Sequence, residues 1–204
     1  AHPGFLRSKL SLRQVLELGV SFTSALQYLH EDFSPDAMLI HRDLKPDNIA
    51  FTQNGRLKLI DFGLTACVKK KSSSNEAYAM TGNTGSLRYM APEVCLCLPY
   101  NEKVDIYGFA IIMWHVLTGE RPFEEYQTHR DFVMEVATAG ARPPLEGLET
   151  KLELKQILEA CWDREMSNRP SANQVKMKLS TMLEEMGLDP HHPHPGRSQS
   201  CTVS

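Results

Sequence analysis

Four polar side chains in the first third of the chain have the types and spacing to handle a phosphate group. Asp43, Lys45 and Asn48 share one short stretch, and Asp61 follows thirteen positions after Asn48. Phosphoryl transfer from a nucleotide needs divalent cations on the phosphates, a group that orients the attacking hydroxyl, and nearby positive charge. Carboxylate and carboxamide oxygens suit Mg²⁺, Asp43 can accept the hydroxyl proton, and Lys45 can act as a point charge. The set therefore predicts phosphoryl transfer.

A β-hairpin is expected to bring two of these side chains together. Residues 49–51 and 57–60 are predicted to form two short strands, and Asn54-Gly55 between them supplies the positive-φ residues that a tight hairpin turn prefers. Asn48 immediately precedes the first strand and Asp61 immediately follows the second. Folding of the hairpin should therefore place both side chains at a two-point clamp for a metal ion.

The other predicted elements are helices. Ser11 and Gln14 fit a capping box, and apolar residues at steps of three and four predict a helix from there to Leu29-His30. A mobile loop is predicted over residues 69–84. Further helices are predicted at residues 104–117, 131–138 and 152–161, and after Pro170. The fold class is mostly α with a short β-hairpin, as one domain at residues 1–188 followed by a disordered tail at 189–204.

Composition excludes several classes of protein. The chain has 204 residues, 42% of them hydrophobic, and a formal net charge of −3, which fits one well-buried domain and argues against nucleic acid as a partner. No stretch approaches the roughly 20 apolar residues that a membrane-spanning helix needs, so no membrane segment is expected. Five cysteines form no regular framework, which favours a reducing, cytoplasmic location. The first residue is Ala1, and the chain is expected to be the interior of a longer protein.

Three tripeptides, in order, resemble the motifs of eukaryotic protein kinases: His41-Arg42-Asp43, Asp61-Phe62-Gly63 and Ala91-Pro92-Glu93. The resemblance implies ATP and Mg²⁺ as cofactors and protein substrates as partners. It assigns Asp43 as the catalytic base, Lys45 to the transferred phosphate, and Asn48 and Asp61 to the metal ion. Lys45 in its context is similar to the serine/threonine pattern, and residues 105–123 and 161–171 resemble the tyrosine-kinase-like branch.

Several further residues take roles from the same resemblance. Ser86 should hydrogen-bond toward Asp43 and Lys45, and Asp105 should brace the backbone of the catalytic loop. Glu93 and Arg169 are expected to form a structural ion pair. The remaining assignments place His41 and Phe62 in the apolar spine of the active state, and Ala50 at the adenine floor, where a larger aliphatic residue is common.

Arg42, next to the base, predicts regulation by phosphorylation. In kinases that resemble this chain, a phosphate on the activation segment neutralises such a cation and orders the segment. Thr81 and Thr84 are the predicted sites, and Ser72–Ser74 are weaker candidates.

The largest departure from the kinase pattern lies upstream of His41. A glycine-rich loop, a strand lysine and a helix glutamate are all missing from the forty residues before it, so the chain resembles the C-terminal lobe alone, with the N-terminal lobe absent. We expect the isolated chain to be inactive and its longer parent to be active. Two alternatives remain open: a pseudokinase or regulatory binding module, and a small-molecule phosphotransferase, which the protein-docking segment 85–93 disfavours.

Overall fold

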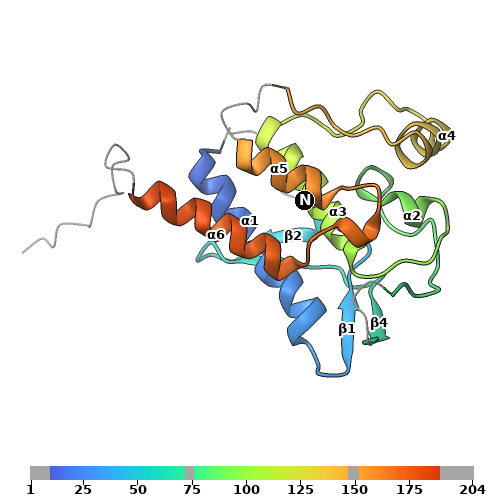
Figure 1. The fold of residues 1–204 in the computed structure, drawn as a ribbon, viewed down its shortest axis with the longest axis horizontal. Helices are drawn as coiled ribbons and strands as arrows, with labels where there is room; N and C mark the ends of the chain where they lie inside the picture. Colours follow the sequence, from blue (N-terminus) through green and yellow to red (C-terminus); the bar gives the residue numbers. More distant parts are fainter. Residues whose placement is uncertain (1–9, 72–75, 147–151, 189–204) are drawn as a thin grey trace, which may run out of the picture.

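The structure is a computed structural model that describes residues 10–71, 76–146 and 152–188. It contains a body of helices and two small antiparallel pairs of strands (Figure 1). The expectations of a disordered tail at 189–204 and of phosphorylation at Ser72–Ser74 lie outside the described residues.

The first helix, α1 (Leu12–Gln27), begins as its sequence predicts. The Ser11 side chain accepts a hydrogen bond from the Gln14 backbone, and the Gln14 side chain accepts one from the Ser11 backbone, so the capping box is confirmed. The helix continues beyond the predicted end at Leu29-His30 as a π-helical turn, η1 (Tyr28–Asp32). This extension places the buried His30 against a side chain of another helix, described below.

Three long helices form the core with α1. These are α3 (Lys103–Thr118), α5 (Leu152–Cys161) and α6 (Ala172–Leu188), which match the predicted helices closely. Figure 1 shows α6 lying along α1, with α3 beside them. A side chain at Gly19 of α1 would meet Leu179 of α6 at 2.9 Å and Met113 of α3 at 3.3 Å, so glycine lets the three helices pack closely.

Shorter elements complete the helical body. The predicted helix 131–138 forms as α4 (His129–Phe132) followed by a π-helix, η4 (Val133–Thr138). The described residues also form a short helix, α2 (Pro92–Cys95), and the 3-10 turns η2 (Pro46–Asn48), η3 (Leu87–Tyr89) and η6 (Met166–Asn168).

The predicted hairpin is present as β2 (Ile49–Phe51) and β3 (Leu57–Leu59), which pair antiparallel with Ile49 opposite Leu59. Its turn differs from the prediction. Gly55 has a positive φ of 74°, whereas Asn54 does not, and the Thr52 amide donates to the Arg56 carbonyl. Five residues connect the strands, as the predicted strand bounds imply, and the difference is that Gly55 alone of the two turn residues adopts a positive φ.

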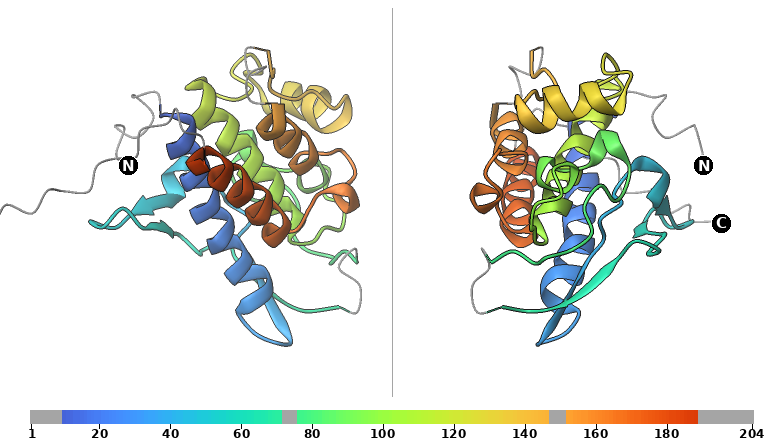
Figure 2. Two further views of the ribbon diagram at one scale, coloured as in Figure 1. Left: turned by 60° about the vertical axis from the view of Figure 1, so that its left-hand side comes forward. Right: turned by 90° about the vertical axis from the view of Figure 1, so that its right-hand side faces the viewer.

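A second antiparallel pair was not predicted. β1 (Ala37–Ile40) pairs with β4 (Ala66–Lys69), and Ala37 lies opposite Lys69. Residue 69, predicted to begin a mobile loop, therefore ends a strand. Figure 2 shows this pair projecting from the end of the helical body that lies nearest to η1.

Among the described residues, no helix is both long enough and apolar enough to cross a membrane.

Candidate phosphotransfer site

Three donors hold the Asp43 carboxylate. The Lys45 ammonium donates to Oδ2 at 2.8 Å, the Asn48 amide donates to the same oxygen at 3.1 Å, and the Ser86 hydroxyl donates to Oδ1 at 2.8 Å. Burial by itself would raise the pKa of Asp43, but the hydrogen bonds from Lys45 and Ser86 outweigh it and hold this pKa below its ordinary value. Asp43 is therefore ionised at neutral pH, as a proton acceptor must be.

Ser86 reaches Asp43 because a glycine precedes it. Gly85 has a φ of 103°, which L side chains rarely adopt, and an added Cβ there would collide with the Arg42 carbonyl oxygen. The segment can thus lie directly on the catalytic-loop backbone. The predicted hydrogen bond from Ser86 to Asp43 is confirmed. Lys45 donates to the other oxygen of the same carboxylate, so Ser86 and Lys45 are linked through Asp43.

Asn48 and Asp61 lie at the same end of the hairpin. The Ile60 amide donates to the Asn48 carbonyl at 3.0 Å, which aligns the residue before Asp61 with Asn48. The Asn48 side-chain nitrogen donates to Asp43, to its carbonyl at 2.8 Å as well as to its carboxylate, so its Oδ1 is left for another ligand. Asp61 is exposed, and its Oδ1 accepts a hydrogen bond from the Gly63 amide at 3.3 Å.

These oxygen donors fit Mg²⁺, a hard cation that takes one or two protein ligands and keeps several waters. Within residues 10–71, 76–146 and 152–188, no group of three or more His, Cys, Asp and Glu side chains could hold a metal ion. The candidate metal site is therefore the pair Asn48 and Asp61, which needs a phosphate or water to complete it. Both Asp61 and Arg42 have positive φ values, of 61° and 66°, that non-glycine residues rarely adopt.

Asp105, at the start of α3, braces the catalytic loop as predicted. Its carboxylate accepts hydrogen bonds from the His41 amide at 2.8 Å and the Arg42 amide at 2.9 Å. His30 of η1 lies 2.9 Å from the same carboxylate, a partner that the sequence did not reveal. Burial opposes ionisation of Asp105, but the hydrogen bond and charge of His30 lower its pKa overall.

The rings of His41 and Phe62 lie in contact, with their centroids 5.2 Å apart. His41 Nε2 also lies 3.2 Å from the Ile60 carbonyl oxygen, so the catalytic loop and the strand that leads to Asp61 are joined directly. Phe62 remains 46% exposed. The geometry agrees with the predicted apolar spine, whose role stays a prediction.

Arg42 reaches into residues 61–93, which the kinase resemblance assigns as the activation segment. Its guanidinium donates to the Leu64 carbonyl at 2.6 Å, to the Thr81 hydroxyl at 3.0 Å and to the Tyr100 hydroxyl at 3.2 Å. The Thr84 hydroxyl instead donates to backbone carbonyls, at 3.1 Å to Gly82 and 3.3 Å to Thr81. Of the two predicted phosphorylation sites, Thr81 is therefore the one in contact with the arginine.

The predicted ion pair between Glu93 and Arg169 is confirmed. It is bidentate, with distances of 2.5 Å and 2.9 Å between nitrogens and oxygens, and both residues are buried. Arg169 also stacks on the Tyr107 ring, 5.2 Å from its centroid. This pair fixes the end of the activation segment to the helical body, away from the Asp43 carboxylate.

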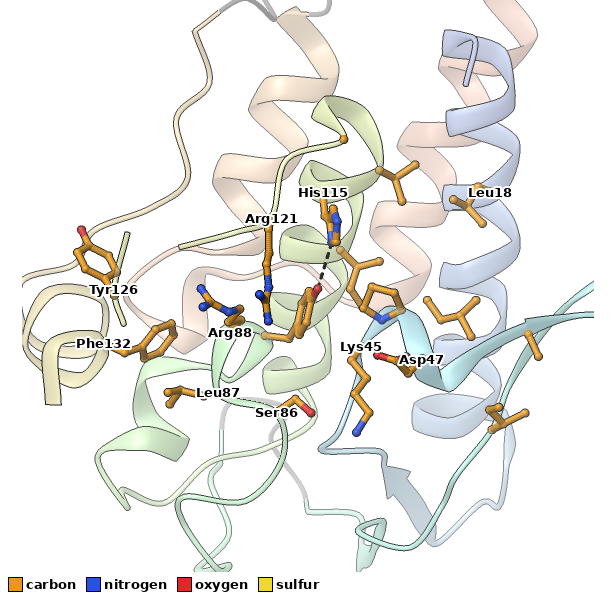
Figure 3. A pocket seen from close by; sticks show the side chains of 18 of the residues that line it. Leu18, Lys45, Asp47, Ser86, Leu87, Arg88, His115, Arg121, Tyr126 and Phe132 are labelled. Carbon is orange, nitrogen blue, oxygen red and sulfur yellow. Dashed lines mark hydrogen bonds between the residues drawn. The ribbon is translucent and has the colours of Figure 1, made fainter. Parts of the chain in front are cut away.

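A cavity of about 980 Å³ opens beside the site. Lys45 and Ser86, which hold the Asp43 carboxylate, line it, and so does Ala50 from β2 (Figure 3 draws the cavity). The small Ala50 side chain is half-buried there, between Ile49 and Phe51. Its predicted place under an adenine ring stays a prediction.

The chain matches the protein kinase domain family over residues 6–179. The serine/threonine-protein kinase VIK of Arabidopsis thaliana is 34% identical over 191 residues, which cover 92% of this chain and 42% of that protein. The serine/threonine-protein kinase STY17 of the same plant is 32% identical over 181 residues, covering 89% of this chain and 30% of that protein. The dual specificity protein kinase shkD of Dictyostelium discoideum is 29% identical over 188 residues, covering 92% and 24%.

The chain therefore belongs to the protein kinase domain family. Within that family it falls in the tyrosine-kinase-like branch, as residues 105–123 and 161–171 predict. It spans less than half the length of VIK, STY17 and shkD.

Proposed function

We propose that this chain is the substrate-side lobe of a protein serine/threonine kinase, which transfers the γ-phosphate of ATP to hydroxyl groups of protein substrates. The observation that carries the proposal is the Asp43 carboxylate, held by donors from three separate residues and kept ionised. A scaffold without catalysis would gain no physical benefit from this arrangement.

Each polar group has a defined part in the proposed reaction. Asp43 orients the substrate hydroxyl and accepts its proton, while Ser86 fixes the direction of the carboxylate. Lys45, whose pKa is raised mainly by its hydrogen bond to Asp43, stays cationic beside the transferred phosphate. Mg²⁺, when held by Asn48 and Asp61, would neutralise charge on the nucleotide phosphates.

The exposed apolar surface around the site supports the proposal that a second lobe covers it. Phe51, Ile60, Phe62 and Leu64 are 41%, 42%, 46% and 39% exposed, and all four lie on or next to the segments that carry Asn48 and Asp61. A nucleotide-binding lobe supplied by the longer chain would bury these side chains and complete the ATP site. The chain alone is therefore proposed to be inactive.

Two further proposals accompany this one. A phosphate on Thr81 would lie against the Arg42 guanidinium and order the activation segment. The described cysteines, Cys67, Cys95, Cys97 and Cys161, are all free, which supports a reducing cytoplasmic location.

The proposed function is tested by phosphate transfer from ATP to peptides that carry a serine, a threonine or a tyrosine. We expect transfer to serine and threonine by the longer chain encoded with its upstream sequence, none by the 204-residue chain, and none when Mg²⁺ is chelated. Asp43→Asn in the longer chain should lower the rate by about 10²–10⁴-fold, because it removes the proton acceptor. Asp32→Asn, at an exposed carboxylate of η1, is the matched control and should leave the rate unchanged.

Three results would count against parts of the proposal. Transfer by the 204-residue chain would refute the need for a second lobe. A full rate for Asp43→Asn would refute the role of the base, and a preference for the tyrosine peptide would refute the serine/threonine specificity.

A further inference from the structure

The 980 Å³ cavity adjoins Asp43 through two of its lining residues, Lys45 and Ser86. Lys45 and Ser86 form its near edge, and both donate hydrogen bonds to the Asp43 carboxylate at 2.8 Å. The opposite wall comes from the end of α3 and the loop that follows it, at His115 and Arg121 (Figure 3). The proposed phosphate transfer at Asp43 does not require the charge of that wall.

The charged lining is mostly cationic. Lys45, Arg88 and Arg121 line the cavity against one carboxylate, that of Asp47. Arg88 donates to the carbonyls of Pro122, at 3.0 Å, and Phe123, which hold the guanidinium in place without neutralising its charge. The wall therefore presents a fixed positive charge.

Arg121 is the cation available to a ligand. Its side chain is exposed, and Figure 3 shows it reaching from the loop after α3 toward Arg88. In the part of the chain that the structure describes, Arg121 forms no ion pair, whereas Lys45 is paired with Asp43. Asp47 lies on the other side of the cavity, next to Lys45.

The hydrogen-bonded pair of Tyr89 and His115 in the lining does not cancel the positive charge. The Tyr89 hydroxyl and His115 Nδ1 lie 3.0 Å apart. Burial raises the pKa of Tyr89 to about 12, while burial and the charge of Arg121 lower the pKa of His115. Both side chains are therefore neutral at neutral pH, and the net charge of the wall is that of the two arginines.

We infer that the side of this cavity between Ser86 and Arg121 is a substrate groove that selects peptides with aspartate or glutamate beside the phosphorylated residue, through Arg88 and Arg121. The opposite side, at the β2–β3 hairpin, is the part that the proposed second lobe would cover. The inference rests on the proposed function, since it names the substrates of the same site. Complementary charge favours an acidic peptide, and a basic peptide would meet Arg121 at a cost, so the preference arises from attraction and repulsion together.

Peptide binding to the 204-residue chain tests the inference without requiring catalysis. Three fluorescent peptides share one central serine and differ in their flanking residues, which are glutamate, glutamine or lysine. We expect the glutamate peptide to bind at least about fivefold more tightly than the lysine peptide at low salt, with the difference shrinking as ionic strength rises. Equal binding, tighter binding of the lysine peptide, or no binding of any peptide at about 1 mM would overturn the inference.

Matched variants assign the effect to the cavity. Arg121→Glu should weaken binding of the glutamate peptide by about fivefold and strengthen binding of the lysine peptide, since it replaces attraction by repulsion. Asp47→Asn should strengthen binding of the glutamate peptide by about twofold, an increase that misfolding cannot produce. Arg56→Glu, at the exposed hairpin turn outside the cavity, is the control and should change neither affinity. A glutamate preference that survives Arg121→Glu would overturn the inference.

The two proposals fail in different experiments. A charge preference in binding, together with no phosphate transfer by the longer chain, would refute the proposed function alone. Phosphate transfer by the longer chain to all three peptides at equal rates, with equal binding, would refute the acidic selection alone.

Discussion

The buried pair of Glu93 and Arg169 offers the sharpest test of the energetics of this fold. Glu93→Gln removes the negative charge and keeps the size of the side chain. Arg169, only 1% exposed, would then keep a buried charge without its carboxylate partner. Breaking one side of a buried ion pair costs about 3–5 kcal/mol, a large part of the roughly 5–15 kcal/mol that stabilises a typical domain. We expect the unfolding midpoint to fall by about 6–20 °C.

Urea unfolding provides the measurement, because two buried tryptophans, Trp114 and Trp162, report the loss of the core through their fluorescence. The surface pair of Arg13 and Glu17 is the matched control. Its atoms lie 3.5 Å apart and its side chains are 39% and 54% exposed, so Glu17→Gln should cost no more than about 0.5 kcal/mol.

A double-mutant cycle separates the pair from its surroundings. Arg169→Met also loses the contact with the Tyr107 ring and leaves the Asp163 carbonyl without its donor, so it should cost more than Glu93→Gln. The cycle also needs Glu93→Met alone and the double variant with Glu93→Met and Arg169→Met. The double variant should lose less stability than the sum of these two single variants, by about 2 kcal/mol or more. A Glu93→Gln protein within about 1 kcal/mol of the unchanged chain, or additive effects in the cycle, would refute this reasoning.

Two further predictions concern the catalytic loop and the activation segment. Asp105→Asn should destabilise the chain by about 3 kcal/mol, because three hydrogen-bonded groups lose a charged acceptor. Folding lowers the pKa of Asp105, so its carboxylate stabilises the folded state fully when the pH is above the ordinary pKa of about 4. This stabilisation is lost as the pH falls through the lower pKa that Asp105 has in the folded state. Urea unfolding between pH 3 and 6 should therefore show a weaker dependence on pH in the variant, and an unchanged dependence would contradict this assignment. Mass spectrometry of the active longer chain should find phosphate on Thr81. Thr81→Val should lower the activity more than Thr84→Val, because Thr81 contacts Arg42 whereas the Thr84 hydroxyl bonds only to Thr81 and Gly82. Equal effects of the two substitutions would count against a role for the contact with Arg42.

Local sequence rules predicted the elements whose partners lie close in the chain. The capping box at Ser11 and Gln14 depends on residues three apart, and the hairpin depends on strands joined by five residues. The tripeptide motifs located Asp43 and Asp61, and the spacing of five positions after Asp43 located Asn48, because the chemistry of the site fixes residue types at set spacings. These predictions needed no knowledge of the tertiary structure.

Features that depend on distant residues were missed. β4 forms because Ala66–Lys69 meets a strand about thirty positions upstream, and no periodicity in four residues reveals such a partner. His30 likewise lies seventy-five positions from Asp105, and a single histidine at the end of a helix carries no signal of its own. That the Arg121 side chain lines the cavity could not be predicted either, because its orientation depends on how the loop after α3 packs.

The left-handed backbone at Arg42 and Asp61 has a consequence for the engineering of this protein. Each such conformation costs a non-glycine residue of order 1 kcal/mol or more, and glycine would relieve the cost. Laboratory evolution that screens only for heat resistance would thus favour glycine at Asp61, whose exposed carboxylate accepts one hydrogen bond of 3.3 Å, and would discard that carboxylate. At Arg42 the three hydrogen bonds of the guanidinium oppose the same change. Heat resistance and turnover must be selected together if this scaffold is to be improved.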